Sequence, residues 1–331
     1  MSCSIFNGCI VLDAQIGVHE PQARPKNLDS SECSGNLSQG SGMSYTLTGF
    51  EGKVAVVTGA GRMRSIGRPI ALALAQAGCD VVLTGTGRAP ETYPEDERDA
   101  HWRDIESVAD EIRQLGRRAL PVVSDVSNPE SIDALLARTI AELGRVDFLI
   151  NNAGATRGDD RPPVTELSID TWHRVMNVNL NGTFYMSRAF AKQMGAQGDG
   201  GAIINISSLA AQLLAPDTGA YATTKVAING LSTIMARELG PKKIRVNVVA
   251  PGIVETSRLD DVPRGKVWDD MIAGYISLGR AGTGEDIAHL VTFLCSDQGE
   301  WITGQNIYVD GGHLPTPRRH DARHELTALQ P

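Results

Sequence analysis

The chain lacks several features that define specialised classes of protein. No apolar run in its 331 residues approaches the ~18 residues of a membrane-spanning helix. Lys and Arg (31) are outnumbered by Asp and Glu (39), which gives a formal net charge of −8 and argues against a nucleic acid or an anionic membrane as the partner. No basic segment followed by a long apolar stretch opens the chain, so no secretory signal is predicted. We therefore expect a cytoplasmic protein that acts on a small molecule.

Cysteines are few, and no metal-ligand pattern is present. The five cysteines are an odd number without the spacing of a disulfide framework, which is typical of reduced thiols in a cytoplasmic protein. The histidines show no metal-ligand spacing with cysteines or carboxylates, so they are interpreted as surface or packing residues and no metal is predicted.

The two ends of the chain differ in composition from its middle. Residues 1–44 include a Ser- and Gly-rich run at 30–42 and show no lasting helical or strand periodicity, so we expect a mostly disordered extension, with Met43 as a hypothetical start of translation. The Pro- and Arg-rich residues 314–331 are expected to form a loose tail. Between them, residues 45–313 show no internal repeat or break in composition and are predicted to form one domain.

Strand-like and helix-like segments alternate through this domain. Strands are expected at 53–58, 80–84, 119–124, 146–150, 202–206, 244–249 and 306–309, and helices at 69–77, 105–115, 129–143, 168–194 and 284–295, with a further helix that opens near Tyr221. This alternation predicts an α/β fold with a doubly wound parallel sheet, that is, a Rossmann fold with three α/β/α layers.

A glycine-containing turn from Gly59 to Gly67 joins the first strand to the first helix. Glycine lets a ligand approach the backbone, and the exposed N–H groups of a helix N-terminus attract phosphate, so the turn favours a dinucleotide pyrophosphate. Glycine turns also join strands to helices for purely structural reasons. The turn alone therefore leaves both interpretations open.

The second strand ends at Gly85-Thr-Gly-Arg88 without a carboxylate. An Asp or Glu at this point would bind a ribose 2′-hydroxyl, whereas its absence and a nearby Arg favour a 2′-phosphate. Arg62 and Arg88 are the candidate partners, so the sequence favours NADP and leaves NAD possible. A polar, irregular stretch at 89–103 follows and is interpreted as an insertion ahead of the next helix.

Tyr221 and Lys225 are four residues apart, so on a helix they share one face. Ser208 closes the apolar strand that precedes them, which can bring three polar groups together. A nearby ammonium lowers the pKa of a phenol from its ordinary value of about 10, so the arrangement predicts proton transfer at a carbonyl or carbinol oxygen. The pattern is short, and an interfacial Tyr beside a solvated Lys would explain it equally well.

Several motifs in order along residues 50–312 resemble the short-chain dehydrogenase/reductase family, in its single-domain branch that is similar to 3-oxoacyl reductases. They are Thr58-Gly59 with Gly67, Asp125-Val126, Asn151-Asn-Ala-Gly154, Asn179, the Ser208, Tyr221 and Lys225 set, and Pro251-Gly252 with Thr256. The resemblance implies a hydride-transferring oxidoreductase that acts on a carbonyl or secondary alcohol with NAD(P)(H), and a homo-oligomer, either a dimer or a tetramer.

The resemblance also implies a role for each site residue. Tyr221 would be the general acid/base, Ser208 would stabilise the substrate oxygen, Lys225 would lower the pKa of Tyr221 and bind the nicotinamide ribose, and Asn179 would hold a water that links Lys225 to solvent. The expected cofactor-binding residues are Gly59, Gly61, Arg62, Ile66, Gly67, Arg88, Asp125, Val126, Asn152, Ala153, Gly154, Tyr221, Lys225, Pro251, Gly252 and Thr256.

The glycine turn departs from the family pattern. It is two residues longer, and Ser65 stands where the middle glycine would align, so the turn is expected to bulge, with Arg62 or Arg64 reaching a phosphate. Substrate walls are expected at 155–164 and 255–278, and neither segment contains a charged pattern that identifies a substrate. Two alternatives remain, namely an epimerase or dehydratase that retains its nicotinamide, and a non-catalytic dinucleotide sensor.

Overall fold

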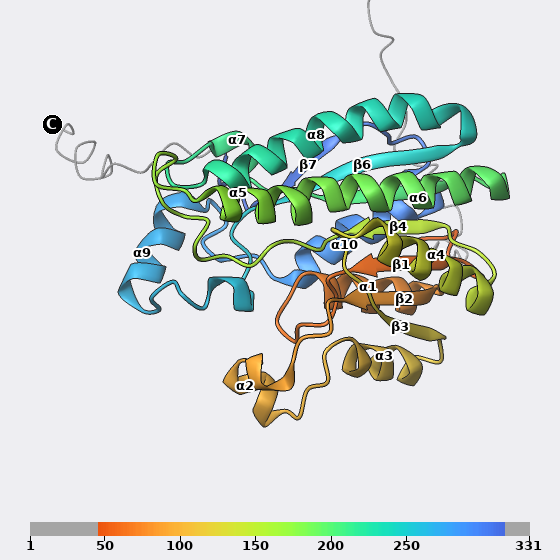
Figure 1. The fold of residues 1–331 in the computed structure, drawn as a ribbon, viewed down its shortest axis with the longest axis horizontal. Helices are drawn as coiled ribbons and strands as arrows, with labels where there is room; N and C mark the ends of the chain where they lie inside the picture. The colour runs from red at the N-terminus through yellow and green to blue at the C-terminus, as the bar shows by residue number, and fades with distance from the viewer. Residues whose placement is uncertain (1–45, 315–331) are drawn as a thin grey trace, which may run out of the picture. The chain divides into compact units, whose positions relative to one another are not determined.

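The computed structural model describes residues 46–314 (Figure 1). The predictions of a disordered extension at 1–44, of a start at Met43 and of a loose tail after Leu314 lie outside the described residues. No helix in the described range is long and apolar enough to cross a membrane.

Seven parallel strands form one sheet in the order β3-β2-β1-β4-β5-β6-β7. The strands are β1 Val54–Thr58, β2 Asp80–Gly85, β3 Ala119–Val123, β4 Phe148–Asn151, β5 Gly201–Ile206, β6 Ile244–Pro251 and β7 Asn306–Val309. The strand order reverses between β1 and β4, and ligands of such sheets bind at the carboxyl ends of the strands beside this reversal. The predicted doubly wound sheet is confirmed.

Helices cover both faces of the sheet (Figure 1). One layer contains α1 Gly67–Ala77, α3 Ile105–Gln114 and α10 Gly284–Cys295, and the other contains α4 Pro129–Leu143, α6 Gly182–Gln197 and α8 Gly219–Leu239. Alternate residues of β1 enter opposite cores, since Ala55 and Val57 pack with α1 while Val54 and Val56 pack with α6. This burial on both faces explains why the strands read as continuous apolar runs.

Three segments differ from the helices expected from the sequence. The helix predicted at 168–194 consists of α5 Ile169–Val175, a π-helical turn at Met176–Asn181, and α6. The stretch predicted to be irregular at 89–103 contains the short helices η1 Pro90–Thr92 and α2 Glu95–Asp99. A short helix α7, Ala210–Leu213, lies in the loop ahead of Tyr221. These local details depend on tertiary contacts that periodicity does not report.

Candidate active site

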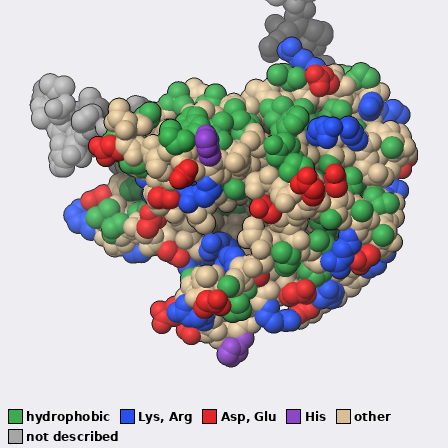
Figure 2. All heavy atoms as spheres, in the orientation of Figure 1, with side chains coloured by type: hydrophobic (Ala, Val, Ile, Leu, Met, Phe, Trp, Pro, Cys, Tyr) green, Lys and Arg blue, Asp and Glu red, His purple; other side chains and the backbone are tan. Residues whose placement is uncertain are grey.

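Polar side chains gather at the carboxyl ends of β4, β5 and β6, close to the first turns of α8. Ser208 follows β5 by two residues, and Tyr221 and Lys225 lie in α8. The parallel sheet places these strand ends at one edge, so residues far apart in the chain reach the same volume. The surface on this side is hollowed between α2 and α9, Lys266–Tyr275, and Lys and Arg side chains line the hollow (Figure 2).

Lys225 is buried beneath Tyr221. Its Nζ lies 5.6 Å from the centroid of the Tyr221 ring and donates a hydrogen bond to the Ile206 carbonyl at 2.8 Å. Burial lowers the pKa of the ammonium, Tyr221 counteracts this, and Arg258 adds to it, so the pKa lies below its ordinary value. A desolvated cation in this position acts strongly on the charge of its neighbour.

The Tyr221 phenol has a lowered pKa. Burial alone would raise the pKa, but the positive charges of Lys225, Arg258 and Arg161 and a hydrogen bond with Ser208 outweigh burial. The phenolate is therefore reached at a lower pH than for a free tyrosine. A phenol with these neighbours can donate a proton to a substrate oxygen or accept one from it.

Asn179 is buried in the π-helical turn. Its Oδ1 accepts the Ala155 N–H at 2.8 Å and its Nδ2 donates to Thr224 Oγ1 at 3.2 Å. The side chain thereby ties the loop after β4 to α8, one position before Lys225. Single π-helical turns are frequent at functional sites, and the predicted water-holding role of Asn179 stays a prediction.

The glycine turn is fixed to the end of β4. Thr58 Oγ1 accepts the N–H groups of Asn152 and Ala153, both at 2.9 Å. Asn152 Nδ2 donates to the carbonyls of Thr58 and Gly59 at 2.8 and 3.0 Å. A Cβ on Gly67 would lie 2.6 Å from Asn152 Nδ2, so the close approach requires glycine. These residues form the kind of backbone surface that a dinucleotide needs, and they fit the implied cofactor.

The other predicted cofactor residues surround this surface less closely. Gly154 borders Asn179, since its Cβ would lie 3.5 Å from Asn179 Oδ1. Val126 packs against the first residue of α6, while the Asp125 carboxylate accepts hydrogen bonds from Ser127. The remaining residues lie in the glycine turn, beside α2, and at and beyond the end of β6, and are Gly61, Arg62, Ile66, Arg88, Pro251, Gly252 and Thr256.

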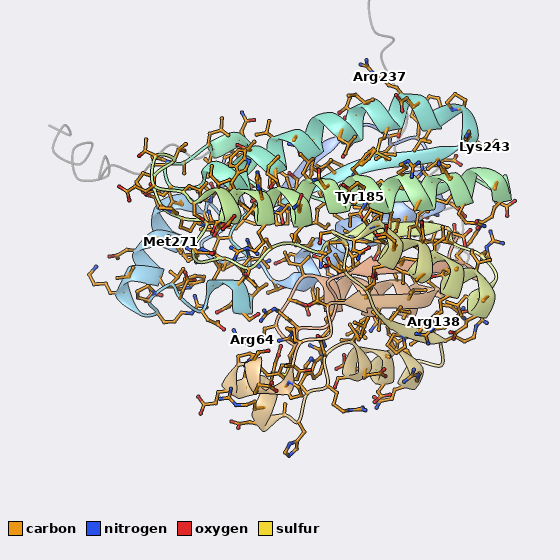
Figure 3. The ribbon with its side chains drawn as sticks, in the orientation of Figure 1. Arg64, Arg138, Tyr185, Arg237, Lys243 and Met271 are labelled. Atoms are coloured by element: carbon orange, nitrogen blue, oxygen red, sulfur yellow. The ribbon has the colours of Figure 1, made fainter. Side chains whose placement is uncertain are left out.

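Arg64, one of the two arginines expected to reach a phosphate, is paired with two carboxylates. Its Nε donates to Asp96 at 2.6 Å, and its Nη groups donate to Asp260 at 2.8 and 2.7 Å. Arg64 thus connects the glycine turn with both α2 and the segment that leads to α9, where Met271 lies (Figure 3). Among the described residues, the Arg62 guanidinium has no hydrogen-bond partner, so Arg62 stays the candidate for the predicted phosphate contact.

The insertion folds back onto the glycine turn. Trp102 Nε1 donates to the Gly61 carbonyl at 2.6 Å, and Glu97 accepts the Met63 N–H at 2.9 Å. Arg88 donates to Glu97 at 2.8 Å and to Asp104 at 3.1 Å. The predicted 2′-phosphate partner is therefore already paired with two buried carboxylates. Sequence reasoning missed both acids, and the available signal was an acidic insertion directly after a strand tip without a carboxylate.

Two further arginines lie against the Tyr221 ring. The guanidinium carbon of Arg161 is 4.9 Å from the ring centroid and that of Arg258 is 5.1 Å from it. They come from the two segments expected to form the substrate walls, in which no charged pattern had been identified. The sequence did not indicate this arrangement, because each segment contributes one arginine and the two come together only in the folded chain.

Known oxidoreductases are similar to this chain in sequence and in fold. The family model described as Enoyl-(Acyl carrier protein) reductase matches residues 59–313. The chain is 36% identical to the 2-dehydro-3-deoxy-D-gluconate 5-dehydrogenase of Escherichia coli (strain K12), over 80% of the chain and 96% of that protein.

Two solved structures share the fold over most of their length. A 7α-hydroxysteroid dehydrogenase complexed with NADH and 7-oxo glycochenodeoxycholic acid matches with a TM-score of 0.70 and 34% identity, over 81% of this chain and 96% of that chain. A blue fluorescent protein from a metagenomic library, in complex with NADPH, matches with a TM-score of 0.68 and 32% identity, over 80% and 99% of the two chains.

Proposed function

The chain belongs to the short-chain dehydrogenase/reductase family, whose members are NAD(P)-dependent oxidoreductases of alcohols and carbonyls, and from this premise we propose that Tyr221 is its general acid/base. The supporting observation is the position of Tyr221 above the buried Lys225, with the phenol pKa lowered by the surrounding positive charges. A bound nicotinamide dinucleotide supplies or accepts the hydride of such a reaction.

In this proposal each of four site residues has a separate role. Tyr221 passes a proton to the substrate oxygen during reduction and removes it during oxidation. Ser208 hydrogen-bonds the same oxygen and stabilises its charge. Lys225 keeps the Tyr221 pKa low and binds the nicotinamide ribose. Asn179 holds the loop after β4 against α8 and so positions the Lys225 helix.

A pair of matched variants tests this division of labour. Tyr221→Phe removes one oxygen and should lower turnover by about 10²–10⁴-fold while cofactor affinity stays within about threefold. Tyr185→Phe on α6 (Figure 3) removes the same atom elsewhere and should leave both quantities unchanged. Turnover of Tyr221→Phe within a few fold of the parent chain would refute the assignment.

For the cofactor, we propose NAD rather than the NADP favoured by the sequence. Asp104 lies between the glycine turn and the end of β2, since a Cβ on Gly61 would lie 1.6 Å from Asp104 Oδ1 and one on Gly85 would lie 3.8 Å from Oδ2. The residue that follows the insertion thus brings a carboxylate to the strand tip that lacks one. A carboxylate accepts a hydrogen bond from a ribose 2′-hydroxyl and repels a 2′-phosphate.

Paired titrations with NADH and NADPH, followed by nicotinamide fluorescence, test the choice. The parent chain should bind NADH at least tenfold more tightly, and Asp104→Asn should remove most of that preference. Asp99→Asn is the control because it removes the same charge from an exposed position in α2. Tighter binding of NADPH by the parent chain would instead support Arg62 and Arg88 as 2′-phosphate partners.

The two alternatives predict different outcomes. An epimerase or dehydratase would retain its nicotinamide through purification and complete a reaction without net oxidation of the substrate. A dinucleotide sensor would bind the cofactor without turnover of any carbonyl. We also propose a cytoplasmic location and a dimeric or tetrameric assembly. Sedimentation of the purified chain tests the assembly.

A further inference from the structure

We propose that the substrate carries a carboxylate, and that Arg161 and Arg258 bind this carboxylate beside Tyr221. The inference rests on the proposed function, because it assumes that the substrate oxygen meets the Tyr221 hydroxyl. It adds the chemical class of the substrate, an oxo acid or hydroxy acid with a short distance between its carboxylate and its reacting carbon.

The two arginines approach the same ring from different segments. Arg161 lies in the loop between β4 and α5, and Arg258 lies in the short helix η4, Ser257–Leu259. Both guanidinium carbons are within 5.1 Å of the Tyr221 ring centroid. A substrate whose carbonyl oxygen reaches the phenol hydroxyl therefore places its next few atoms within range of both guanidinium groups.

The hydrogen-bonding capacity of the two arginines is largely unused. Within residues 46–314, Arg161 Nε is buried without a hydrogen-bond partner, and the Asp160 carboxylate oxygen nearest to it is 3.5 Å away. Arg258 donates one hydrogen bond, to the Ala155 carbonyl at 2.6 Å. A buried guanidinium nitrogen without a hydrogen-bond partner is unfavourable, and a carboxylate matches the two-pronged donor geometry of a guanidinium.

Two other arginines near the loop that contains Arg161 are already paired with carboxylates. Arg157 forms an ion pair with Asp261, and Arg174 forms one with Asp159. Arg258 forms no ion pair with any residue that the structure describes. Arg161 has one ion pair, with Asp160 at 3.5 Å, so the positive charge at the Tyr221 ring is only partly balanced, which favours a negatively charged ligand at this place.

A competing explanation is that both arginines only lower the Tyr221 pKa. Lys225 already acts on the phenol in this way and is the strongest of the groups that lower its pKa. The two explanations differ for uncharged substrates. If the arginines only lowered the Tyr221 pKa, their replacement would change the reaction of a neutral ketone and of an oxo acid equally. If they bind a carboxylate, their replacement would weaken the binding of the acid alone.

Binding of oxo acids and their amides tests the proposal. Pyruvate, 3-oxobutanoate and 4-oxopentanoate are each titrated against the chain saturated with NAD⁺, with which a ketone does not react, and each is compared with its uncharged amide by calorimetry. At least one acid should bind tenfold or more tightly than its amide. Arg161→Gln and Arg258→Gln should each weaken the binding of that acid by about 10- to 100-fold and leave the binding of its amide unchanged.

Arg174→Gln is the control, since it removes the same charge at a position that is paired with Asp159. It should leave acid binding unchanged, and NADH affinity should be unchanged in all three variants. The proposal is overturned if no acid binds more tightly than its amide, or if both arginine variants weaken acid and amide alike. Binding of an acid to the NAD⁺ complex, together with no oxidation of NADH or NADPH when the same acid is supplied, would support the carboxylate site and contradict the proposed reaction, so the two failures are distinguishable.

Discussion

The substitution Glu97→Gln tests whether the insertion at 89–103 stabilises the glycine turn. Glu97 is only 1% exposed. It accepts the Met63 N–H of the glycine turn at 2.9 Å and a hydrogen bond from Arg88 at 2.8 Å. Glutamine has the same shape, but it keeps one acceptor oxygen and presents an NH₂ group where the second carboxylate oxygen was. The Arg88 guanidinium would then face a donor.

The expected cost follows from the bond that is lost. A hydrogen bond between charged groups contributes about 1.5–3 kcal/mol, and removal of one partner leaves the buried Arg88 with Asp104 alone. We expect the free energy of unfolding to fall by about 2–3 kcal/mol. For a domain of this size, that corresponds to a decrease in Tm of about 4–12 °C. Because Met63 belongs to the turn, cofactor affinity should fall as well.

Thermal unfolding followed by circular dichroism, with and without NADH, measures both effects. Asp99→Asn is the control, since Asp99 is exposed in the same helix α2 and its replacement should change Tm by less than about 1 °C. If Glu97→Gln has the Tm of the parent chain, or if both variants lower Tm by the same amount, the insertion does not stabilise the glycine turn through Glu97.

Three shorter predictions follow from single contacts. Gly67→Ala should abolish dinucleotide binding in a fluorescence titration, because its Cβ would lie 2.6 Å from Asn152 Nδ2, and unchanged affinity would contradict the close fit of the turn. In the proposed mechanism, alcohol oxidation requires the Tyr221 phenolate, whose pKa is lowered. The rate should therefore rise with pH to a midpoint below about 10, and a midpoint at or above that value refutes the assignment. The hydrogen bond from Arg280 holds the Asp286 pKa below its ordinary value, so the ionised carboxylate stabilises the fold above about pH 4 and this stabilisation is lost as the pH falls. Asp286→Asn should lower the free energy of unfolding in urea by about 1 kcal/mol at pH 7 and by less at pH 3. An equal loss at both pH values would count against the interaction.

The parts of the site that the sequence predicted depend on residues close together in the chain. Strand and helix periodicity is a local property, so the order of elements and the parallel sheet were predicted correctly. The spacing of Tyr221 and Lys225 fixes their common helix face, and the glycine turn was recognised because Gly59 and Gly67 lie between one strand and the next helix. The close approach of Asn152 and Ala153, which explains why glycine is needed there, came only from the structure. Family membership was predictable for the same reason, because its motifs are short and ordered.

The sequence alone determined the Rossmann architecture and the reaction class of this protein, and it predicted the set of catalytic residues. Only the tertiary structure decided the environment of the charges. It paired Arg88 with Glu97 and Asp104, and it brought Arg161 and Arg258 to one face of a tyrosine. The physical reason is that charge interactions depend on distance in space and on burial. A loop that folds back onto the carboxyl ends of the strands changes the distances between charged groups and their burial, and no periodic pattern in the sequence reports this.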